Sequence, residues 1–376
     1  LVHVPVHDPD KWSDKTLIRA LVEALNLLTG DDWHFEFRAR KVSAEPPRQN
    51  RMKFPSNAEA VMAYSDGMDS RAVAGLESKR LGSRLVRLRV GAKQHDVSKK
   101  ERLRLPFAAI PYSVKLNNGK NTENSARSRG FKFCVISTMA AYLIDAPSVI
   151  VPESGQGALA PAFLPVGQGY EDYRSYPLFT ALMARFFNAL LGYHIQYRFP
   201  RLWMTKGETL REFVDVCGSD ANWATTRSCW QQSRQVAVSG KRRQCGVCAA
   251  CMLRRLSVHA AGLNEPPETY VWESLNAITW ESGAAKEFVS FTQALREYSI
   301  AGVLHLEHFA SLRKAVQYEL IKRRRINELA RSLSEPPAGV AQNLDRLLQQ
   351  HANEWSEFTN DLGPKSFVRQ WIDDAS

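Results

Sequence analysis

A short polar segment, Tyr64 to Ser70, carries groups that suit anion binding. It follows an apolar run, Ala60 to Ala63, and precedes a stretch of helical character. A strand, a tight turn and a helix N-terminus in this order bring free backbone N–H groups and the positive end of a helix dipole to one place. Ser65 and Ser70 add hydroxyl donors, and Gly67 lets the backbone approach a ligand closely. The segment predicts a phosphate site, and a capped strand-to-helix turn is the alternative.

Two aspartates in this segment have opposite implications for a phosphate ligand. Asp69 can cap the following helix or help to hold a metal ion. Asp66 places a carboxylate beside the phosphates and repels them, although aspartate tolerates unusual backbone angles better than most residues. Asp66 is therefore compatible with a tuned binding loop or with a loop that has lost catalysis.

Four of the six cysteines lie within 23 residues, at Cys229, Cys245, Cys248 and Cys251. Disulfides at such short spacings are disfavoured in a chain that shows no secretion signal. Thiolates at this spacing can enclose one zinc ion, and four of them leave no open position, so the site would be structural. An iron–sulfur cluster is the minor alternative. Cys134 and Cys217 lie in apolar helical runs, where free cysteines act as small buried hydrophobes.

The composition is that of a soluble globular protein, with 44% hydrophobic and 24% charged residues in 376. The chain contains no apolar run long enough for a transmembrane helix and begins without the segments of a signal peptide, so we expect a cytoplasmic protein with no membrane contact. The net charge is +11, but its basic residues form separate clusters around Lys99, Lys241 and Lys322. Solvated helix faces explain these clusters, and nucleic-acid binding is not favoured.

Hydrophobic periodicity divides the chain into three ranges. Residues 1–56 read as an appended unit, with a helix from Asp14 to Gly30, a strand around Phe35 and a linker. Residues 57–265 alternate strands and helices, which indicates a parallel sheet covered by helices on both faces. Residues 266–376 read as a helical C-terminal region. In parallel sheets ligands bind at the carboxyl ends of strands, where the Ser65–Ser70 segment falls.

The expected elements of the middle range follow one another closely. Strands are predicted at 84–90, 107–116, 148–151 and 194–199, and helices at 71–80, 96–104, 127–144 and 175–191. In the C-terminal range, apolar residues from Leu312 to Leu333 keep helical spacing, Pro336-Pro337 interrupts it, and the pattern resumes from Val340 to Phe358. His305 and His308 could share a helix face as ligands, but a third ligand is missing nearby, so ordinary packing is favoured.

Several blocks in order resemble 7-cyano-7-deazaguanine synthase, the QueC family. The first is the Tyr64–Ser70 segment, which is similar to the SGGxDS pyrophosphate loop of ATP pyrophosphatases except at Asp66. The other blocks are Arg129-Gly130-Phe131-Lys132-Phe133, Thr205-Lys206-Gly207-Glu208, Ser228-Cys229-Trp230 and Cys245-Gly-x-Cys248-x-x-Cys251. The resemblance covers about residues 57–263. It implies a doubly wound α/β fold of the pyrophosphatase-loop (adenine nucleotide alpha hydrolase-like) type with a zinc knot spanning 229–251.

Three features depart from the housekeeping family. Residues Pro152–Gly157 stand where a Gly-Val-Asn type segment is usual, and the first two cysteines are further apart than usual. The aspartate and cysteine of the family's Tyr-Pro-Asp-Cys block have no evident counterpart around Arg174-Ser175-Tyr176-Pro177. With the added N- and C-terminal ranges, these features resemble the divergent QueC-like proteins of bacterial anti-phage cassettes, of the Qat and type IV CBASS kinds.

The resemblance implies ATP-dependent activation of 7-carboxy-7-deazaguanine as an acyl-adenylate, which ammonia then attacks. Adenylation supplies a good leaving group, and the protein supplies positioning and charge neutralisation. The implied catalytic residues are Ser65, Asp69, Ser70 and Arg129. The implied ATP site, with Mg²⁺, consists of Ser65, Gly67, Asp69, Ser70 and Leu88. The implied substrate contacts are Glu153, Gln156, Arg174 and Lys206.

Alternatives to this chemistry remain open. If the defence-cassette resemblance holds, the nucleophile is the N-terminal amine of a partner protein from the same gene cassette, and the terminal helices would offer docking surfaces. A housekeeping synthase would use ammonia. An adaptor that keeps the fold and the zinc but has lost catalysis through Asp66, and a tRNA-modifying enzyme that uses the basic surface, are the rival classes.

Overall fold

The computed structural model describes residues 1–41, 57–65, 67–90, 107, 110, 128–164, 171–231 and 236–375. The chain forms two compact units, which are considered separately below. Unit 1 consists of Leu1–Ser65, Glu77–Pro152 and Asp172–Pro200, and unit 2 consists of Asp66–Leu76, Glu153–Glu171 and Arg201–Ser376. These units interleave along the chain, whereas the three ranges expected from periodicity are sequential and stay a prediction.

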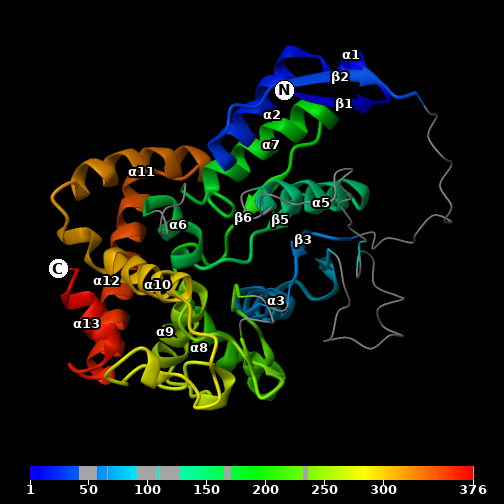
Figure 1. The fold of residues 1–376 in the computed structure, drawn as a ribbon. Helices are drawn as coiled ribbons and strands as arrows, with labels where there is room; N and C mark the ends of the chain where they lie inside the picture. Colours follow the sequence, from blue (N-terminus) through cyan, green and yellow to red (C-terminus); the bar gives the residue numbers. More distant parts are fainter. Residues whose placement is uncertain are drawn as a thin grey trace. The chain divides into compact units, whose positions relative to one another are not determined.

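The N-terminal part of unit 1 contains the predicted helix and the predicted strand around Phe35, together with a strand and a short helix that were not predicted. Helix α2 (Lys15–Thr29) begins after Asp14, whose side chain accepts hydrogen bonds from two backbone N–H groups, and ends at Gly30, which adopts φ 72°. Leu17, Leu21, Leu25 and Leu28 are buried, and the helix packs beside α7 (Pro177–Leu191), as Figure 1 shows. Strands β1 (Val2–Val6) and β2 (Phe35–Ala39) pair in parallel next to the short helix α1 (Pro9–Trp12).

The central sheet of unit 1 is parallel, in the order β4-β3-β5-β6. Its strands are β3 (Ala60–Ala63), β4 (Leu85–Leu88), β5 (Ser148–Ile150) and β6 (Gln196–Arg198). Helix α5 (Arg129–Leu143) shares an apolar core with β3, β4 and β5. The predicted parallel sheet is confirmed, and the doubly wound pyrophosphatase-type arrangement stays a prediction. The strand predicted at 107–116 and the helix at 96–104 lie almost wholly outside the described residues, apart from a parallel bridge between Val90 and Ile110.

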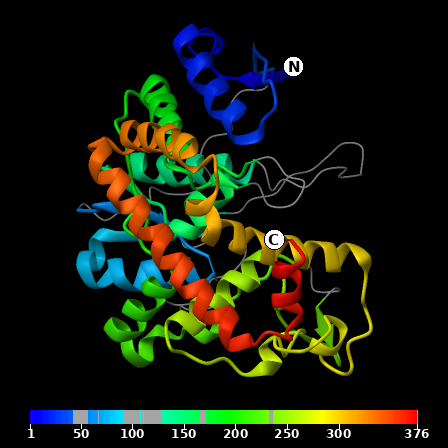
Figure 2. The same cartoon turned by 90° about the vertical axis from the view of Figure 1, so that its left-hand side faces the viewer.

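Unit 2 is mainly helical. Helix α3 (Met68–Leu81) starts in this unit and ends in unit 1. The other helices of unit 2 are α6 (Gly155–Phe163), α8 (Lys206–Cys217), α9 (Ala249–Ala260), α10 (Gln293–Ser311), α11 (Tyr318–Leu333), α12 (Pro337–Leu362) and α13 (Phe367–Asp373), with a small antiparallel pair β7 (Ala237–Val238) and β8 (Lys241–Arg242). Figure 2 shows the long helix α12 with the short α13 after it.

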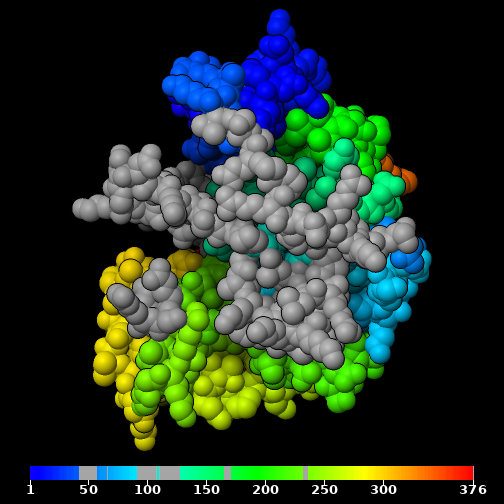
Figure 3. Space-filling model, turned by 90° about the vertical axis from the view of Figure 1, so that its right-hand side faces the viewer, coloured from blue at the N-terminus to red at the C-terminus, as the bar shows by residue number. Residues whose placement is uncertain are grey.

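The C-terminal helices pack onto the cysteine-bearing segment in one apolar core. This core contains Cys245, Cys248 and Cys251 together with aromatic residues of the 270–291 segment and of α12 and α13. Helix α10 approaches so closely at Gly302 that a Cβ there would lie 2.6 Å from the Ala249 nitrogen. In Figure 3 residues of the 270–300 stretch (yellow) lie against the cysteine-bearing region (yellow-green). The predicted helical C-terminal region therefore packs within its own unit.

The apolar spacing from Leu312 to Leu333 was misleading in its first half. Val316 is 96% exposed and Leu320 is 74% exposed, and α11 begins only at Tyr318. Helical spacing shows that residues share a face and does not show that this face is covered. Helix α10 was not predicted, although His305 lies within it and is buried, as ordinary packing requires. In the described part of the chain, every helix is too short or too polar to span a membrane.

Candidate functional site

The predicted phosphate loop lies between a strand and a helix, as expected. Strand β3 ends at Ala63, the Tyr64 N–H donates to the Leu88 carbonyl at 2.7 Å, and α3 begins at Met68. The helix thus starts earlier than predicted, and Asp69 and Ser70 belong to its first turn, whose N–H groups lack partners within the helix. The loop divides at the unit boundary, with Ser65 in unit 1 and the following residues in unit 2. Asp66 lies outside the described residues.

The other predicted nucleotide residues are placed as follows. Leu88 is fully buried at the end of β4, in unit 1 with Ser65, so its backbone is the part that faces this loop. Gly67 immediately precedes α3. Ser70 is buried in the first turn of α3. These placements agree with a strand-turn-helix site, and the binding of a nucleotide there stays a prediction.

Asp69 and Lys206, which lie 137 residues apart in the sequence, form an ion pair within unit 2. The Lys206 Nζ donates to Asp69 Oδ2, and the lysine side chain is 8% exposed. Asp69 Oδ1 is buried and accepts no hydrogen bond from a described residue. A buried cation against the first turn of a helix, beside an unsatisfied carboxylate oxygen, is suited to binding an anion together with a metal ion.

Lys206 opens helix α8, and the start of this helix is firmly capped. Thr205 Oγ1 accepts from the Glu208 N–H at 3.1 Å, and Glu208 Oε2 accepts from the Thr205 N–H at 2.8 Å. This reciprocal pair is a capping box, which the Thr-x-x-Glu spacing in the sequence would have indicated. The cap fixes the backbone from which the Lys206 side chain extends.

Gln156 lies inside helix α6 rather than in a loop. Its Oε1 accepts from the Lys206 N–H at 2.7 Å, and its Nε2 donates to His351 Nδ1 at 2.8 Å. Both ends of the amide are therefore bonded within the chain, and a direct role in substrate binding stays a prediction. The residues after β5 form the turn into a helix, which periodicity missed because Gly155, Gly157 and Pro161 are poor helix formers.

Glu153, the other predicted contact from this segment, bends over the first turn of α6. A Cβ at Gly157 would lie 2.1 Å from Glu153 Oε1, so only glycine leaves room for the carboxylate. Ser154 caps α6 without a side-chain hydrogen bond, and its Oγ is buried with no partner among the described residues. This turn thus presents polar groups at a strand end, and recognition of a guanine-like ring by Glu153 stays a prediction.

In unit 1 the predicted residues Arg129 and Arg174 lie near one another. Arg129 is the first residue of α5, and the adjacent Gly130 is so close to Arg174 that a Cβ would lie 3.0 Å from the Arg174 Cα. Burial lowers the pKa of Arg129, the charge of Arg174 lowers it further, and Asp172 opposes the shift. Asp172 pairs with Arg174 at 2.6 Å and was not predicted. Guanidinium groups stay charged at neutral pH, so this cluster is suited to an anion.

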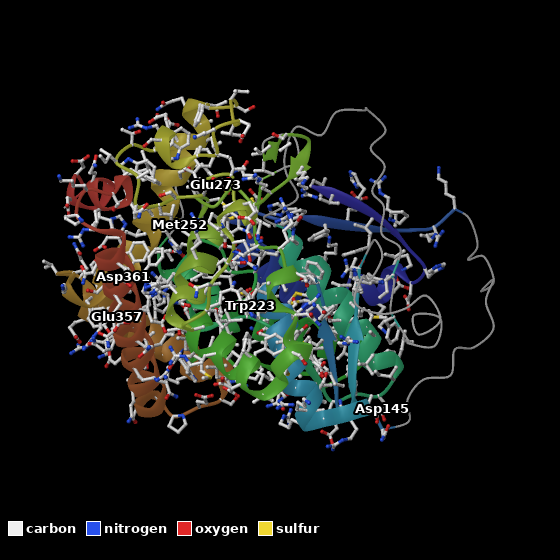
Figure 4. All side chains as sticks on the ribbon, turned by 90° about the horizontal axis from the view of Figure 1, so that it is seen from below. Asp145, Trp223, Met252, Glu273, Glu357 and Asp361 are labelled. Atoms are coloured by element: carbon white, nitrogen blue, oxygen red, sulfur yellow. The ribbon has the colours of Figure 1, made fainter. Side chains whose placement is uncertain are left out.

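The four predicted cysteines form one cluster in unit 2. Their sulfur atoms all lie within 4.8 Å of one another, and the Sγ atoms of Cys245 and Cys251 are 3.7 Å apart. Cys229 Sγ accepts from the Cys245 N–H at 3.2 Å, and Cys245 Sγ accepts from the Cys248 N–H at 3.2 Å. Helix α9 follows directly, and its Met252, labelled in Figure 4, is fully buried in the same core.

This geometry fits a zinc ion. Sulfur atoms on a tetrahedral zinc with bonds of about 2.3 Å lie about 3.8 Å apart, whereas a disulfide needs about 2.05 Å. Three of the cysteines are fully buried, and backbone N–H groups point at two of the sulfur atoms, which stabilises thiolates. Zinc would complete four thiolate ligands here with no open position for water, so its role would be structural.

Residues 162–262 match the family model described as queuosine biosynthesis protein QueC. Over this segment the chain is QueC-like. The match includes Arg174, Lys206 and all four cysteines, and it begins after the Ser65–Ser70 loop, Arg129, Glu153 and Gln156. It does not separate a housekeeping branch from an anti-phage branch. A search of curated proteins found no match to the chain.

Proposed function

We propose that this QueC-like protein uses ATP to activate the carboxylate of 7-carboxy-7-deazaguanine as an acyl-adenylate. The observation that supports the proposal most directly is the partly buried ion pair of Asp69 and Lys206 at the first turn of α3, because it joins the loop to a residue of the QueC-matching segment. A cytoplasmic location, where ATP is available, is part of the same proposal.

The residues of unit 2 supply complementary groups for ATP. The first-turn N–H groups of α3 and the Ser70 hydroxyl would donate hydrogen bonds to phosphate oxygens. The Lys206 side chain would leave Asp69 and bind a phosphate oxygen. Its charge would then offset the negative charge on the phosphates during the displacement at the α-phosphate. Asp69 Oδ1, which has no partner among the described residues, would hold Mg²⁺, whose charge would neutralise the leaving pyrophosphate.

The residues of unit 1 supply most of the remaining assigned groups. Ser65 would donate to a phosphate, and the Leu88 backbone would border the nucleotide. Arg129 and Arg174 would hold an anionic oxygen of a phosphate or of the substrate carboxylate, since two guanidinium groups close together favour a ligand that neutralises them. Glu153, which belongs to unit 2, would accept hydrogen bonds from the ring N–H groups of a guanine-like base.

For the second step we propose attack on the acyl-adenylate by the N-terminal amine of a partner protein, which forms an amide and releases AMP. The departures from the housekeeping pattern at Pro152–Gly157 and near Arg174, and the C-terminal helices beyond the QueC match, support this acceptor. Attack by ammonia, which leads to 7-cyano-7-deazaguanine, is the alternative.

Both steps are tested with the purified full-length chain, ATP, Mg²⁺ and 7-carboxy-7-deazaguanine. We expect pyrophosphate release and AMP formation that depend on the deazaguanine. Intact mass of neighbouring-gene proteins coexpressed with the chain should then show addition of one deazaguanine acyl group. If no AMP forms with ammonia or with such a protein, the adaptor hypothesis replaces the enzyme hypothesis, and tRNA-dependent turnover would favour the tRNA-modifying class instead.

A further inference from the structure

Helix α12 contributes polar side chains to the first turn of α8, from which Lys206 extends. The helix covers Pro337–Leu362 and lies wholly outside the segment that matches the QueC family, 162–262. Its contacts with α8 therefore come from a part of this chain that lies outside the family match. The inference drawn from these contacts deepens the proposed function and rests on it.

The first connection runs through His351. Its Nε2 lies 3.0 Å from the Leu306 carbonyl and its Nδ1 accepts from Gln156 Nε2, which requires a neutral ring protonated at Nε2. Burial lowers the pKa of His351 to about 4, so the ring stays neutral at physiological pH. Gln156 Oε1 in turn accepts from the Lys206 N–H. A single chain of hydrogen bonds thus runs from α10 through α12 and α6 to the backbone of Lys206.

The second connection runs through Glu354, one turn further along α12. Its Oε1 accepts from the Thr205 hydroxyl at 2.6 Å and from Gln350 Nε2 at 3.1 Å. A Cβ at Gly207 would lie 3.3 Å from Glu354 Oε1, so the carboxylate sits directly against the first turn of α8. Burial raises the pKa of Glu354, and the Thr205 hydrogen bond opposes that shift. The carboxylate thereby orients the hydroxyl that caps α8.

The third connection is Arg346, two turns before Glu354. Its Nη1 donates to the Trp203 carbonyl at 2.8 Å and to Glu208 Oε2 at 2.9 Å. Glu208 is the acidic member of the α8 capping box. Arg346 and Glu354 thus contact the Trp203–Glu208 segment directly and His351 reaches it through Gln156, so α12 holds both sides of Lys206.

Packing alone does not account for these polar groups. Leu344, Leu347 and Leu348 are fully buried on α12 and already fasten it to the unit. Burying a carboxylate and an imidazole costs free energy unless their bonds are well made, so a helix needed only as cover would do better with apolar residues at 351 and 354. The polar residues do more than cover: Glu354 binds the cap residue of α8, and His351 binds Gln156, which in turn accepts from the Lys206 N–H.

We propose that α12 is the positioning element for Lys206, with His351 and Glu354 as positioning residues that fix the first turn of α8, and with it the point from which the Lys206 side chain pairs with Asp69 and would reach a phosphate oxygen in the adenylation step. Neither residue touches the reacting groups; each acts through Gln156 or Thr205. Loss of either one should leave ATP binding largely in place and lower the rate of the chemical step, because a misplacement of about 1 Å can cost about a hundredfold in rate.

The test compares Glu354→Ala and His351→Ala with two matched variants. Glu354→Gln keeps an acceptor for the Thr205 hydroxyl and should rescue most of the effect. Asn353→Ala changes an exposed neighbour on the same helix and should change nothing. Thermal unfolding and zinc content show which variants are folded, and only folded variants are compared further.

The first readout needs no ligand. We expect acylation of Lys206 by an amine reagent, followed by peptide mass spectrometry, to be about tenfold faster in Glu354→Ala and His351→Ala, with faster amide exchange over 68–76 and 205–217, because local opening exposes the lysine. Unchanged Lys206 protection in folded variants would overturn the proposal, whether or not the chain turns over ATP.

The second readout is turnover with 7-carboxy-7-deazaguanine. We expect kcat to fall about tenfold to a hundredfold in the alanine variants while KM for ATP changes about threefold or less. A change confined to KM would overturn the positioning role. If Lys206 protection is lost as expected but the unmodified chain forms no adenylate, the positioning device stands and the proposed function fails.

Discussion

The cysteine cluster and the Ser65–Ser70 loop differ in how each is assembled. All four cysteines come from one 23-residue stretch and lie in one apolar core of unit 2. The loop divides between the two compact units after Ser65, and the lysine that pairs with its Asp69 comes from 137 residues away. A structural metal site can thus be specified locally, because its ligands only have to meet one another. A catalytic site needs groups from several chain segments around a ligand.

The largest effect should come from substitutions in the cysteine cluster. Cys248→Ser or Cys251→Ser should remove bound zinc and unfold much of unit 2, because both sulfur atoms lie at the centre of its apolar core and zinc binding contributes folding energy. Elemental analysis and thermal unfolding measure both changes. Cys217→Ser is the matched control, since this cysteine is outside the cluster and should leave one zinc per chain. Natural protein purified without chelators that holds no metal would contradict the assignment.

Substitutions in the Asp69–Lys206 ion pair should lower activity and leave the fold of the protein intact. Asp69→Ala or Lys206→Met should lower adenylate formation by about a hundredfold to a thousandfold, the range seen when one preorganised charge or donor is removed. Zinc content should stay at one ion per chain. Lys79→Met, at an exposed position of the same helix α3, serves as the control. Unchanged turnover in both site variants would show that this ion pair takes no part in the reaction.

Acidification should weaken zinc binding at the cysteine cluster. Burial raises the pKa of the Cys245 and Cys251 thiols above the ordinary value, so in the metal-free state both hold their protons at neutral pH. Zinc must displace these protons, and its affinity therefore falls as pH falls, by about tenfold or more per pH unit. Competition with a chromophoric chelator between pH 6.5 and 8 measures the slope. A flat profile would mean that the thiols are already ionised before zinc binds.

The smallest effect is expected at Asp66, in the loop but outside the described residues. A helix dipole, Mg²⁺ and the basic excess of the protein can offset one negative charge close to phosphates. Asp66→Gly should therefore change ATP affinity or turnover by about tenfold or less, roughly 1.4 kcal/mol. Isothermal titration and AMP formation report the two quantities. Should the natural chain lack both properties and the glycine variant alone acquire them, the adaptor hypothesis would be correct.

Local chemistry in the sequence was sufficient for much of the fold. Asp14 and Gly30 mark the ends of α2 because capping hydrogen bonds and left-handed backbone angles depend on the residue itself. Apolar runs separated by helices predicted the parallel strands β3, β4, β5 and β6, because a parallel connection needs a crossover. The cysteine spacing predicted the cluster, since its ligands are close along the chain.

Other features were decided only by tertiary structure. Gln156 and His351 are 195 residues apart, and Asp69 and Lys206 are 137 apart, and nothing in either local segment specifies the partner. Helix α6 forms despite glycines and a proline because burial in unit 2 outweighs weak propensity. Val316 and Leu320 keep helical spacing and stay exposed. Periodicity identifies an apolar face of a helix. Which segment packs against that face depends on contacts between segments far apart in the sequence, and these are a property of the whole fold.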